Sequence, residues 1–385
     1  MMACRVCQAK LEKPVYEASA PALTSMMTFV DSPTVVYVCD ACGHAQSCDL
    51  PDVDSFYDTD YRISLQSEDH DQIVGTSAEG DPIFRTDHQA ALGLRLLDIP
   101  QGARVLDYGA AKATTLRKMV QARPDLHPHV FDVSHDYASA WQGWVRDEDQ
   151  AIYEVPAAWH GRFNIIISHF VIEHVRDPIA FLKTLRDLLA PGGRILVSMP
   201  DVAANPGDMT VADHLNHFSV SSLKYSFALA GFTVEVIDTT AFPGAFFAVA
   251  VRNDVLEAPN VEPAEVLAGA TKAQDICRFW ERATRTIDEA AKRLNGCRAV
   301  IYGAGFYGSW INSRIVADIA PTAFLDLNPN LQGSMHFDRP VLVPADIDER
   351  TDVVFVGLNP LKARAIIAGQ PALNKPGLDL VWIDG

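Results

Sequence analysis

The chain has 385 residues, of which 48% are hydrophobic and 21% are charged, and its formal net charge is −17. This length predicts two or three domains, and the composition supplies enough apolar side chains for buried cores. No run of Lys and Arg stands out in the acidic chain. Nucleic acid is therefore excluded as the main partner, because nonspecific binding to phosphate backbones depends on basic side chains.

The first residues lack the apolar core of a signal peptide, and no uninterrupted apolar run is long enough to cross a bilayer. We therefore expect a cytoplasmic protein with no membrane partner, whose oligomeric state stays open between monomer and homodimer. In the cytoplasm, cysteines are mostly thiols or metal ligands rather than disulfides.

Residues 1–60 are predicted to form a small module that a metal ion holds together, because the segment is too short and too broken by prolines to bury a core alone. Its candidate ligands come in two Cys-x-x-Cys pairs: Cys4, Cys7, Cys39 and Cys42. Four thiolates suit a tetrahedral structural Zn²⁺ with no open position for water. His44 and Cys48 lie nearby, and either is an alternative ligand.

Residues 61–255 are predicted to form an open α/β domain. Apolar strands alternate with helices, in the order strand 103–109, helix 114–122, strands 127–134 and 163–170, helix 178–190, turn 191–193, strand 194–200, helix 221–232, and strands 233–240 and 245–252. Such alternation predicts a parallel sheet covered by helices on both faces.

Residues 256–385 are predicted to form a smaller α/β domain behind an acidic linker at 253–266. A long amphipathic helix is expected over 264–294, followed by strands at 298–303, 322–327, 340–344, 352–358 and 378–385. The chain as a whole is thus predicted to have a three-part α/β architecture.

The turn after the first strand of the larger domain, "VLDYGAAKATTL", is the candidate cofactor loop. Ligands of open α/β sheets bind where a strand turns into its helix, and Asp107 and Gly109 lie at that turn. Ala111 and Ala113 replace further glycines, and alanine does not adopt a positive φ at low cost. Asp132 ends the next strand, where a carboxylate holds the hydroxyls of a ribose. This combination suits a nucleoside without a pyrophosphate, such as S-adenosylmethionine.

Here the sequence resembles the class I S-adenosylmethionine-dependent methyltransferases. The resemblance covers about residues 103–252 and is carried by "VLDYGAAKATTL", "FDVS" and the string from Phe163 to Pro200. It implies a Rossmann-like methyltransferase sheet with S-adenosylmethionine as the cofactor. The cofactor-binding residues that we expect are Asp107, Gly109, Ala111, Asp132, Ser168 and His169.

With its two flanking regions, the chain resembles the three-part sugar C-methyltransferases, which act on nucleotide-linked keto-deoxysugars. These proteins carry a "Y-x-E-H"-like stretch, and the corresponding text here is "VADH", in which Asp213 replaces the glutamate and the tyrosine is absent. The resemblance implies a nucleotide-sugar acceptor. Methylation of a sugar oxygen and a non-catalytic binding protein with a degenerate cofactor loop remain as alternatives.

Deprotonation of a carbon next to a ketone, or of a sugar hydroxyl, requires a base, and histidine suits this role near neutral pH. His214 is the predicted base, with Asp213 as its neighbour and His217 in reserve. His174, in "IEHVRDP", is a further candidate, although the adjacent Glu173 is expected to be structural. The resemblance also implies that the segment joining the metal module to the sheet lies over the active site. Its two tyrosine hydroxyls, of Tyr57 and Tyr61, are therefore candidate contacts to substrate or cofactor.

A second glycine-rich loop, "VIYGAGFYGSW", fits the dinucleotide pattern better than the first. Gly303, Gly305 and Gly308 follow a strand, and Asp326 ends the next one. A functional NAD site here would indicate an oxidoreductase, but no set of catalytic partners accompanies it. We expect instead an accessory Rossmann-like domain that helps to hold the nucleotide of the substrate.

Overall fold

The computed structural model describes residues 2–50, 73–76, 81–255 and 258–385. The chain divides into two compact units. Unit 1 comprises Met1–Lys13, Tyr37–Ala204 and Leu215–Ala273; unit 2 comprises Pro14–Val36, Asn205–His214 and Gln274–Gly385. Each unit thus combines segments from more than one of the three predicted regions, and each is described by itself below.

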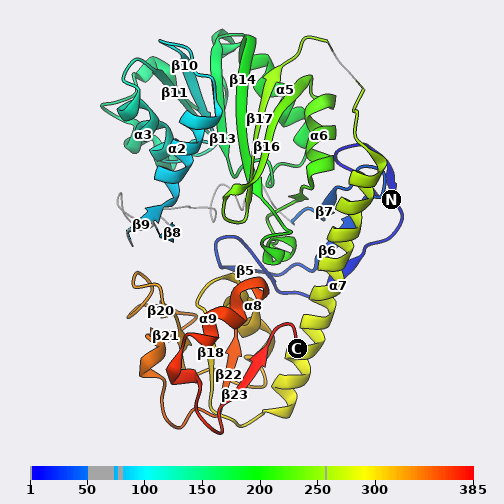
Figure 1. Cartoon of the computed structure of the whole chain (residues 1–385), viewed down its shortest axis with the longest axis vertical. Coiled ribbons are helices and arrows are strands. Elements are labelled where there is room, and N and C mark those ends of the chain that lie inside the picture. Colours follow the sequence, from blue (N-terminus) through cyan, green and yellow to red (C-terminus); the bar gives the residue numbers. More distant parts are fainter. Residues whose placement is uncertain (1, 51–72, 77–80, 256–257) are drawn as a thin grey trace. The chain divides into compact units, whose positions relative to one another are not determined.

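A seven-stranded sheet forms the centre of unit 1 (Figure 1). Its strands, from one edge to the other, are β12 (Gln150–Ile152), β11 (His127–Asp132), β10 (Arg104–Tyr108), β13 (Phe163–His169), β14 (Leu189–Pro200), β17 (Ala245–Arg252) and β16 (Phe232–Phe242). The helices of the same unit are α2 (Arg85–Leu96), α3 (Thr114–Ala122), α4 (Ala138–Trp141), α5 (Pro178–Leu188) and α6 (Val220–Leu229).

Alternating side chains of the central strands point into two cores, one on each face of the sheet. Val105 packs on the face that α2 and α3 cover, whereas its neighbour Leu106 packs on the face that α5 and α6 cover. Both faces are therefore apolar, which explains why these strands form continuous hydrophobic runs in the sequence. The Rossmann-like methyltransferase fold predicted for this region is confirmed.

The sheet is mixed rather than wholly parallel, which corrects one part of the prediction. β17 runs antiparallel to both β14 and β16. The reason is local, because β16 and β17 are joined by a tight turn at Pro243 and Gly244, and a short hairpin connection forces its strands to be antiparallel. The turn predicted at 191–193 also lies within β14.

Outside the central sheet, unit 1 also contains short antiparallel strand pairs. β1 (Met2–Ala3) pairs with β2 (Lys10–Leu11), and β7 (Ala45–Ser47) pairs with β15 (Asn216–His217). A further hairpin joins β8 (Ile73–Thr76) to β9 (Pro82–Phe84). The β7–β15 pairing attaches the cysteine-bearing segment to the α/β part of the unit.

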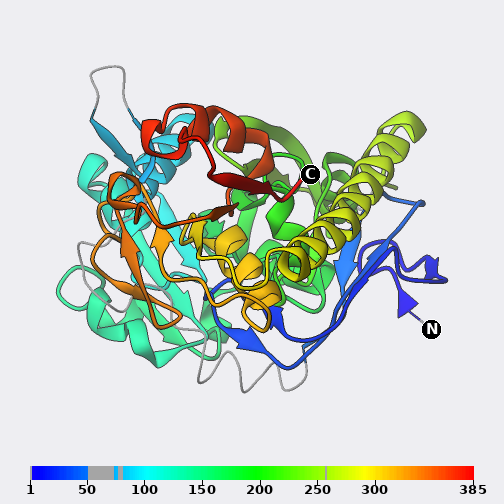
Figure 2. The same ribbon diagram turned by 90° about the horizontal axis from the view of Figure 1, so that it is seen from below.

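Unit 2 contains a six-stranded sheet of its own. The strand order is β20 (Met335–His336), β21 (Arg339–Leu342), β19 (Phe324–Leu325), β18 (Ala299–Tyr302), β22 (Val353–Val356) and β23 (Asp379–Trp382). All neighbouring pairs are parallel except the β20–β21 hairpin. Figure 2 shows α8 (Phe306–Ile315) and α9 (Pro360–Ala368) on opposite sides of these strands.

The rest of unit 2 comes from other parts of the sequence. β3 (Tyr16–Ala18) pairs with β6 (Thr34–Val38), and β4 (Ala22–Leu23) pairs with β5 (Phe29–Val30). The long helix α7 (Pro263–Arg293) begins in unit 1 and ends in unit 2, close to its predicted bounds. Unit 2 also includes the loop 205–214, which carries the predicted base His214.

Candidate functional site

The first glycine loop closes on the carboxylate of Asp132. Asp132 Oδ2 accepts a hydrogen bond of 2.8 Å from the amide of Ala111, and Oδ1 accepts one of 2.9 Å from the amide of Ser134. The amides of Gly109 and Ala110 both donate to the carbonyl of Phe131, which precedes Asp132. The ends of β10 and β11 and the start of α3 are thus joined where a nucleoside is expected to bind.

Two alanines of this loop adopt the left-handed backbone conformation, which was expected to be costly for alanine. The φ angles are +44° for Ala111 and +53° for Ala113. A non-glycine residue in this region costs roughly 1–2 kcal/mol, so the surrounding contacts must hold the loop in place. One such contact is the 2.7 Å hydrogen bond that the indole of Trp141 donates to the carbonyl of Ala111.

Asp107 lies buried at the end of β10, with only 4% of its surface exposed. Burial raises the pKa of its carboxyl well above the ordinary value, and the nearby charge of Asp132 raises it further. Burial also raises the pKa of Asp132, although the hydrogen bonds from the backbone amides of Ala111 and Ser134 oppose that effect. Two such carboxyls at one edge of a sheet are typical of a binding site rather than of a structural core.

Ser168 and His169 end β13, beside β10. Ser168 Oγ donates to the carbonyl of Tyr108 at 2.8 Å, so this hydroxyl holds the ends of the two strands together. His169 Nδ1 lies 2.8 Å from Ser198 Oγ. Burial lowers the pKa of His169 to about 3, helped by the positive charge of Arg85, so the imidazole is neutral at ordinary assay pH. Contact of either residue with the cofactor stays a prediction.

The turn that follows β13 packs against the cofactor loop. Gly109 has a φ of +77°, and a Cβ added there would lie 2.5 Å from Val171 Cγ2. The amide of His174 closes the turn by donating to the carbonyl of Val171 at 3.0 Å. The segment 171–175 therefore connects the candidate base His174 with the loop that is expected to hold the cofactor.

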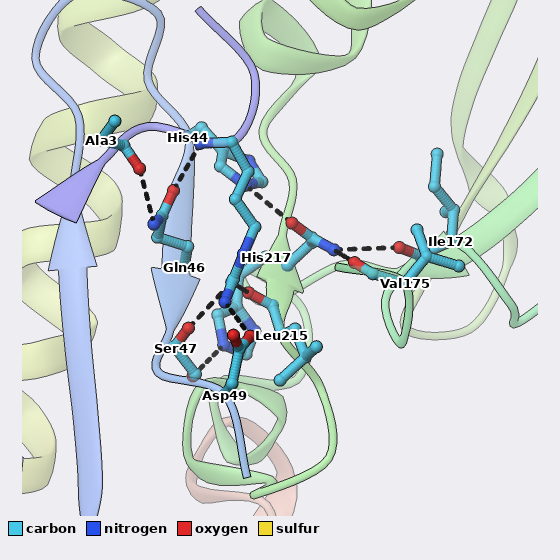
Figure 3. A network of polar contacts seen from close by, with 11 residues as sticks. Ala3, His44, Gln46, Ser47, Asp49, Ile172, Val175, Leu215 and His217 are labelled. Atoms are coloured by element: carbon cyan, nitrogen blue, oxygen red, sulfur yellow. Dashed lines mark hydrogen bonds and ion pairs between the residues drawn. The ribbon is translucent and has the colours of Figure 1, made fainter. Parts of the chain in front are cut away.

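Asn216 holds this turn through several hydrogen bonds (Figure 3). Its side-chain amide Nδ2 donates to the carbonyls of Ile172, at 3.1 Å, and Val175, at 2.7 Å. Its backbone amide donates to the carbonyl of Glu173 at 3.0 Å. Because both Nδ2 hydrogens are engaged, Oδ1 is the acceptor for His44 Nε2 at 3.3 Å, which places the proton of this imidazole on Nε2.

The four predicted metal ligands converge in unit 1. Their sulfur atoms all lie within 4.8 Å of one another, with 3.6 Å between Cys4 and Cys42 and 3.5 Å between Cys7 and Cys39. Zn–S bonds of about 2.3 Å in a tetrahedron require S–S separations of about 3.8 Å, so the arrangement fits a zinc ion. These four residues would hold the ion as thiolates, and the ion would supply structural stability only.

Each Cys-x-x-Cys pair forms a similar knuckle. The residue after the second cysteine has a positive φ in both cases, +62° for Gln8 and +76° for Gly43. Gly43 has no room for a side chain, because a Cβ would lie 2.5 Å from Ser221 Oγ. The backbone of His44 belongs to the second knuckle, since its carbonyl accepts from the amide of Cys39 at 2.8 Å.

The predicted base lies in unit 2, and its carboxylate partner differs from the expected one. His214 Nδ1 is 2.5 Å from Asp208 Oδ1, and both side chains are largely buried. Asp213 instead accepts hydrogen bonds from the backbone amide and the hydroxyl of Ser25, at 2.7 and 2.6 Å. Sequence reasoning therefore missed Asp208, whose pairing with His214 depends on how the loop closes.

His217, the reserve base, lies in unit 1, where its Nε2 is 2.9 Å from Ser47 Oγ. His174 is also in unit 1, so the histidine candidates do not all belong to one unit. Tyr57 and Tyr61 lie outside the described residues. Among the residues that the structure does describe, no helix is long and apolar enough to cross a membrane.

The second glycine loop repeats the geometry of the first. Asp326 Oδ2 accepts from the amide of Ala304 at 2.8 Å, as Asp132 does from Ala111. The first and last glycines serve close packing: a Cβ on Gly303 would lie 2.3 Å from the carbonyl oxygen of Gly357, and one on Gly308 would lie 1.8 Å from that of Gly303. A Cβ on Gly305 would meet nothing within 4 Å.

Residues 84–237 match the model of a protein family described as a methyltransferase domain. They contain the first glycine loop, Asp132, the 171–175 turn and the Asp208–His214 pair. This part of the chain is therefore similar to a methyltransferase domain, for which S-adenosylmethionine is the expected cofactor.

Curated proteins that are similar to the chain include ubiquinone biosynthesis O-methyltransferases. The enzyme of Cereibacter sphaeroides is 35% identical over 106 residues, and that of Xanthomonas axonopodis pv. citri is 31% identical over 106 residues. The alignments cover 28% and 26% of this chain and 41% and 44% of the relatives. The chain thus spans less than half the length of these relatives.

Solved structures with some similarity include an S-adenosylmethionine-dependent methyltransferase from Mesorhizobium loti, with 14% identity and a TM-score of 0.37 over 43% of this chain and 100% of that chain. Another is a phosphoethanolamine N-methyltransferase from Haemonchus contortus, with 15% identity and a TM-score of 0.37 over 44% of this chain and 53% of that chain.

Proposed function

We propose that the protein transfers a methyl group from S-adenosylmethionine to a nucleotide-linked sugar, with a keto-deoxysugar as the favoured acceptor. The methyltransferase domain and the closed loop around Asp132 support methyl transfer. The sugar acceptor rests on the resemblance to three-part sugar C-methyltransferases. The observation that carries the mechanism is the contact between His214 Nδ1 and Asp208 Oδ1.

When bound, S-adenosylmethionine supplies an electrophilic methyl group on a sulfonium sulfur. The acceptor carbon or oxygen would receive this methyl group, and S-adenosylhomocysteine would be the other product. The acceptor also loses a proton, which passes to a base in the protein. Much of the rate enhancement comes from holding acceptor, methyl group and sulfur in line.

The Asp208–His214 pair fits the role of this base. A carboxylate that accepts the Nδ1 proton fixes the imidazole tautomer, so that the lone pair lies on Nε2. The same carboxylate stabilises the imidazolium ion once Nε2 has taken a proton from the acceptor. In this proposal, Asp208 rather than Asp213 orients the base.

Methylation of an oxygen atom is the second candidate function, because the relatives that match are named as O-methyltransferases. Since those alignments cover less than half of each relative, they favour O-methylation only as an alternative. A carbon acceptor next to a ketone and a hydroxyl acceptor use the same base and the same alignment. The site of the new methyl group in the product distinguishes them.

The first experiment incubates the full chain with S-adenosylmethionine and a panel of nucleotide sugars, and detects the gain of one methyl group by mass spectrometry. We expect a methylated nucleotide sugar, and NMR of that product identifies the methylated atom. If the cofactor binds but no nucleotide sugar is methylated, the sugar acceptor is wrong. If neither S-adenosylmethionine nor S-adenosylhomocysteine gives heat on titration, the chain is a binding protein without this cofactor.

The second experiment tests the base. His214→Gln is expected to lower kcat by about a hundredfold or more, the usual scale of general base catalysis, while the Kd for the cofactor stays unchanged. Asp208→Asn is expected to lower kcat in the same way through loss of orientation. His160→Gln, which changes an exposed imidazole, is the matched control and should keep its activity. If His214→Gln retains most of its turnover, the role of base passes to Tyr61 or His174, or alignment of the reactants alone accounts for the rate.

A further inference from the structure

The second glycine loop places a tyrosine hydroxyl against the loop that carries Asp208 and His214. Tyr307 lies in the first turn of α8 and is 7% exposed. Its hydroxyl accepts a hydrogen bond from the amide of Gly207 at 2.7 Å and donates one to Asn205 Oδ1 at 2.9 Å. Burial raises the pKa of Tyr307, so the hydroxyl keeps the proton that it donates.

A tryptophan of α7 holds the same stretch of the loop. The indole of Trp280, which is fully buried, donates to the carbonyl of Pro206 at 2.7 Å. Its ring stacks on Tyr307 with 5.9 Å between the ring centroids and 14° between the planes. Gly207 fits closely, because a Cβ there would lie 2.9 Å from Tyr307 Cζ. Residues 205–207 are thus held by α7 and α8 together.

Residues 205–207 directly precede the Asp208–His214 pair. The amide of Asp208 donates to the carbonyl of Asn205 at 3.1 Å, and the amide of Val211 donates to the carbonyl of Asp208 at 3.1 Å. The amide of His214 then donates to the carbonyl of Val211 at 3.2 Å. Because these turns follow one another without a break, a shift of Asn205 moves Asp208 with respect to His214.

We propose that Tyr307 is a positioning residue for the Asp208–His214 pair, and that the second glycine-rich motif serves to present it. Gly303 and Gly308 allow the strand, the loop and α8 to pack closely, which fixes where the first turn of α8 places its tyrosine. The catalytic consequence rests on the proposed role of His214. The structural part, that Tyr307 sets the His214 hydrogen bond, is independent of that role.

The test compares Tyr307→Phe with Tyr302→Phe in the full chain. Tyr307→Phe keeps the ring that stacks on Trp280 and removes only the hydroxyl. Tyr302 is the matched control, because its buried hydroxyl has no hydrogen-bond partner among the described residues. Should Tyr307→Phe fail to fold, Asn205→Ala removes the acceptor of the same hydroxyl and is expected to have the same effect.

The first readout is the Nδ1 proton resonance of His214, recorded with ¹⁵N-labelled histidine and assigned by its loss in His214→Gln. We expect its exchange with water to become about tenfold faster or more in Tyr307→Phe, because the bond to Asp208 opens more often. Tyr302→Phe should leave it unchanged. An unchanged resonance in both Tyr307→Phe and Asn205→Ala would overturn the proposal.

The second readout is turnover with the acceptor found in the screen. We expect kcat to fall about tenfold in Tyr307→Phe while the Kd for S-adenosylhomocysteine stays the same. If the resonance changes and kcat does not, Tyr307 still positions the pair, and it is the role of His214 as base that is wrong. The resonance and the rate therefore test the two proposals separately.

Discussion

Ala111 shows how one residue can store strain in a binding loop. It has a φ of +44° and is only half-buried, and its amide and carbonyl are both hydrogen-bonded. Glycine adopts this conformation without steric cost, so Ala111→Gly is expected to raise stability by up to about 1 kcal/mol after the entropy of the unfolded glycine is subtracted. Thermal unfolding of the cofactor-free protein measures this effect.

The control is Ala268→Gly, an exposed position within α7 in the same unit. There the same substitution is expected to cost about 1 kcal/mol, because glycine is a poor helix former. Opposite signs for the two variants support the strained loop. A destabilised Ala111→Gly would show that the alanine methyl group contributes more by packing than its backbone costs.

The carboxylate of Asp132 is expected to accept hydrogen bonds from the ribose hydroxyls of the cofactor. Asp132→Asn should weaken S-adenosylmethionine binding by roughly ten- to a hundredfold, since a charge-assisted hydrogen bond contributes about 1.5–3 kcal/mol. Isothermal titration measures the change. Glu154→Gln, an exposed carboxylate beyond β12, is the control and should bind normally. Unchanged affinity in a folded Asp132→Asn would remove this residue from the cofactor site.

The pH dependence of cofactor binding follows from the raised pKa of Asp132. An ordinary aspartate has a pKa of about 4. A carboxyl with a raised pKa takes up its proton at a higher pH than that when the solution is acidified. The protonated form is a weaker acceptor for the ribose hydroxyls, so affinity should fall as pH is lowered through that pKa. In Asp132→Asn this part of the pH dependence should flatten, and a wild-type affinity that rises on acidification would contradict it.

At the scale of elements, the sequence predicted best those strands and helices whose buried side chains form a simple apolar pattern. Strands such as β10 and β13 are apolar on both faces, so their letters alone identify them. α2 escaped notice because a polar residue lies on its buried side, where Gln89 accepts a hydrogen bond from Thr115. The partner of Gln89 is Thr115, 26 residues later in the chain, so the pattern of apolar residues within α2 does not reveal that Gln89 is buried.

The candidate site shows the same division. Asp107 and Asp132 lie at the ends of β10 and β11, and Gly109 directly follows β10, as the sequence predicts. The partner of His214 could not be found in this way, because Asp213, its neighbour in the sequence, is engaged with Ser25, 188 residues away. Asp208 reaches the imidazole only through the successive turns of the loop. Contacts made by loop closure depend on packing that no local pattern encodes.

The hydrogen bonds from Asn216 to the 171–175 turn predict how the turn as a whole responds when they are removed. Asn216→Asp has the same shape but cannot donate to the carbonyls of Ile172 and Val175, and it places an additional acceptor beside them. We expect a loss of about 1–3 kcal/mol in stability and faster amide hydrogen exchange in the turn. Because Val171 packs on Gly109, cofactor affinity should also fall.

Ser47→Ala is the matched control for this variant. It removes a contact to His217 in the same β7–β15 pair and leaves the bonds to the turn in place. We expect it to keep the hydrogen exchange of the turn and the cofactor affinity of the wild type. Equal effects of Ser47→Ala and Asn216→Asp would show that the strand pair as a whole is responsible, and not the side chain of Asn216.

At the scale of the whole molecule, the cysteine cluster lies in a segment with little core of its own, which a bound metal ion is expected to stabilise. Its second knuckle is linked to the methyltransferase part by the β7–β15 pair and by the contact of His44 with Asn216. Arg5, within the first knuckle, donates to the carbonyls of Ser47 and Leu215 and forms an ion pair with Asp49 (Figure 3). If a metal ion is bound, its removal is therefore expected to affect residues beyond the cysteine-bearing segment.

We predict one zinc ion per chain, bound by Cys4, Cys7, Cys39 and Cys42. Its removal by a strong chelator should lower the thermal midpoint and increase hydrogen exchange in the knuckles first and in the 171–175 turn next, since small zinc modules unfold without metal. Cys39→Ser should lose the metal, whereas Cys48→Ser and Cys297→Ser should keep it. Full zinc content in Cys39→Ser, or its loss in Cys48→Ser, would show that the ligand set differs from these four thiolates.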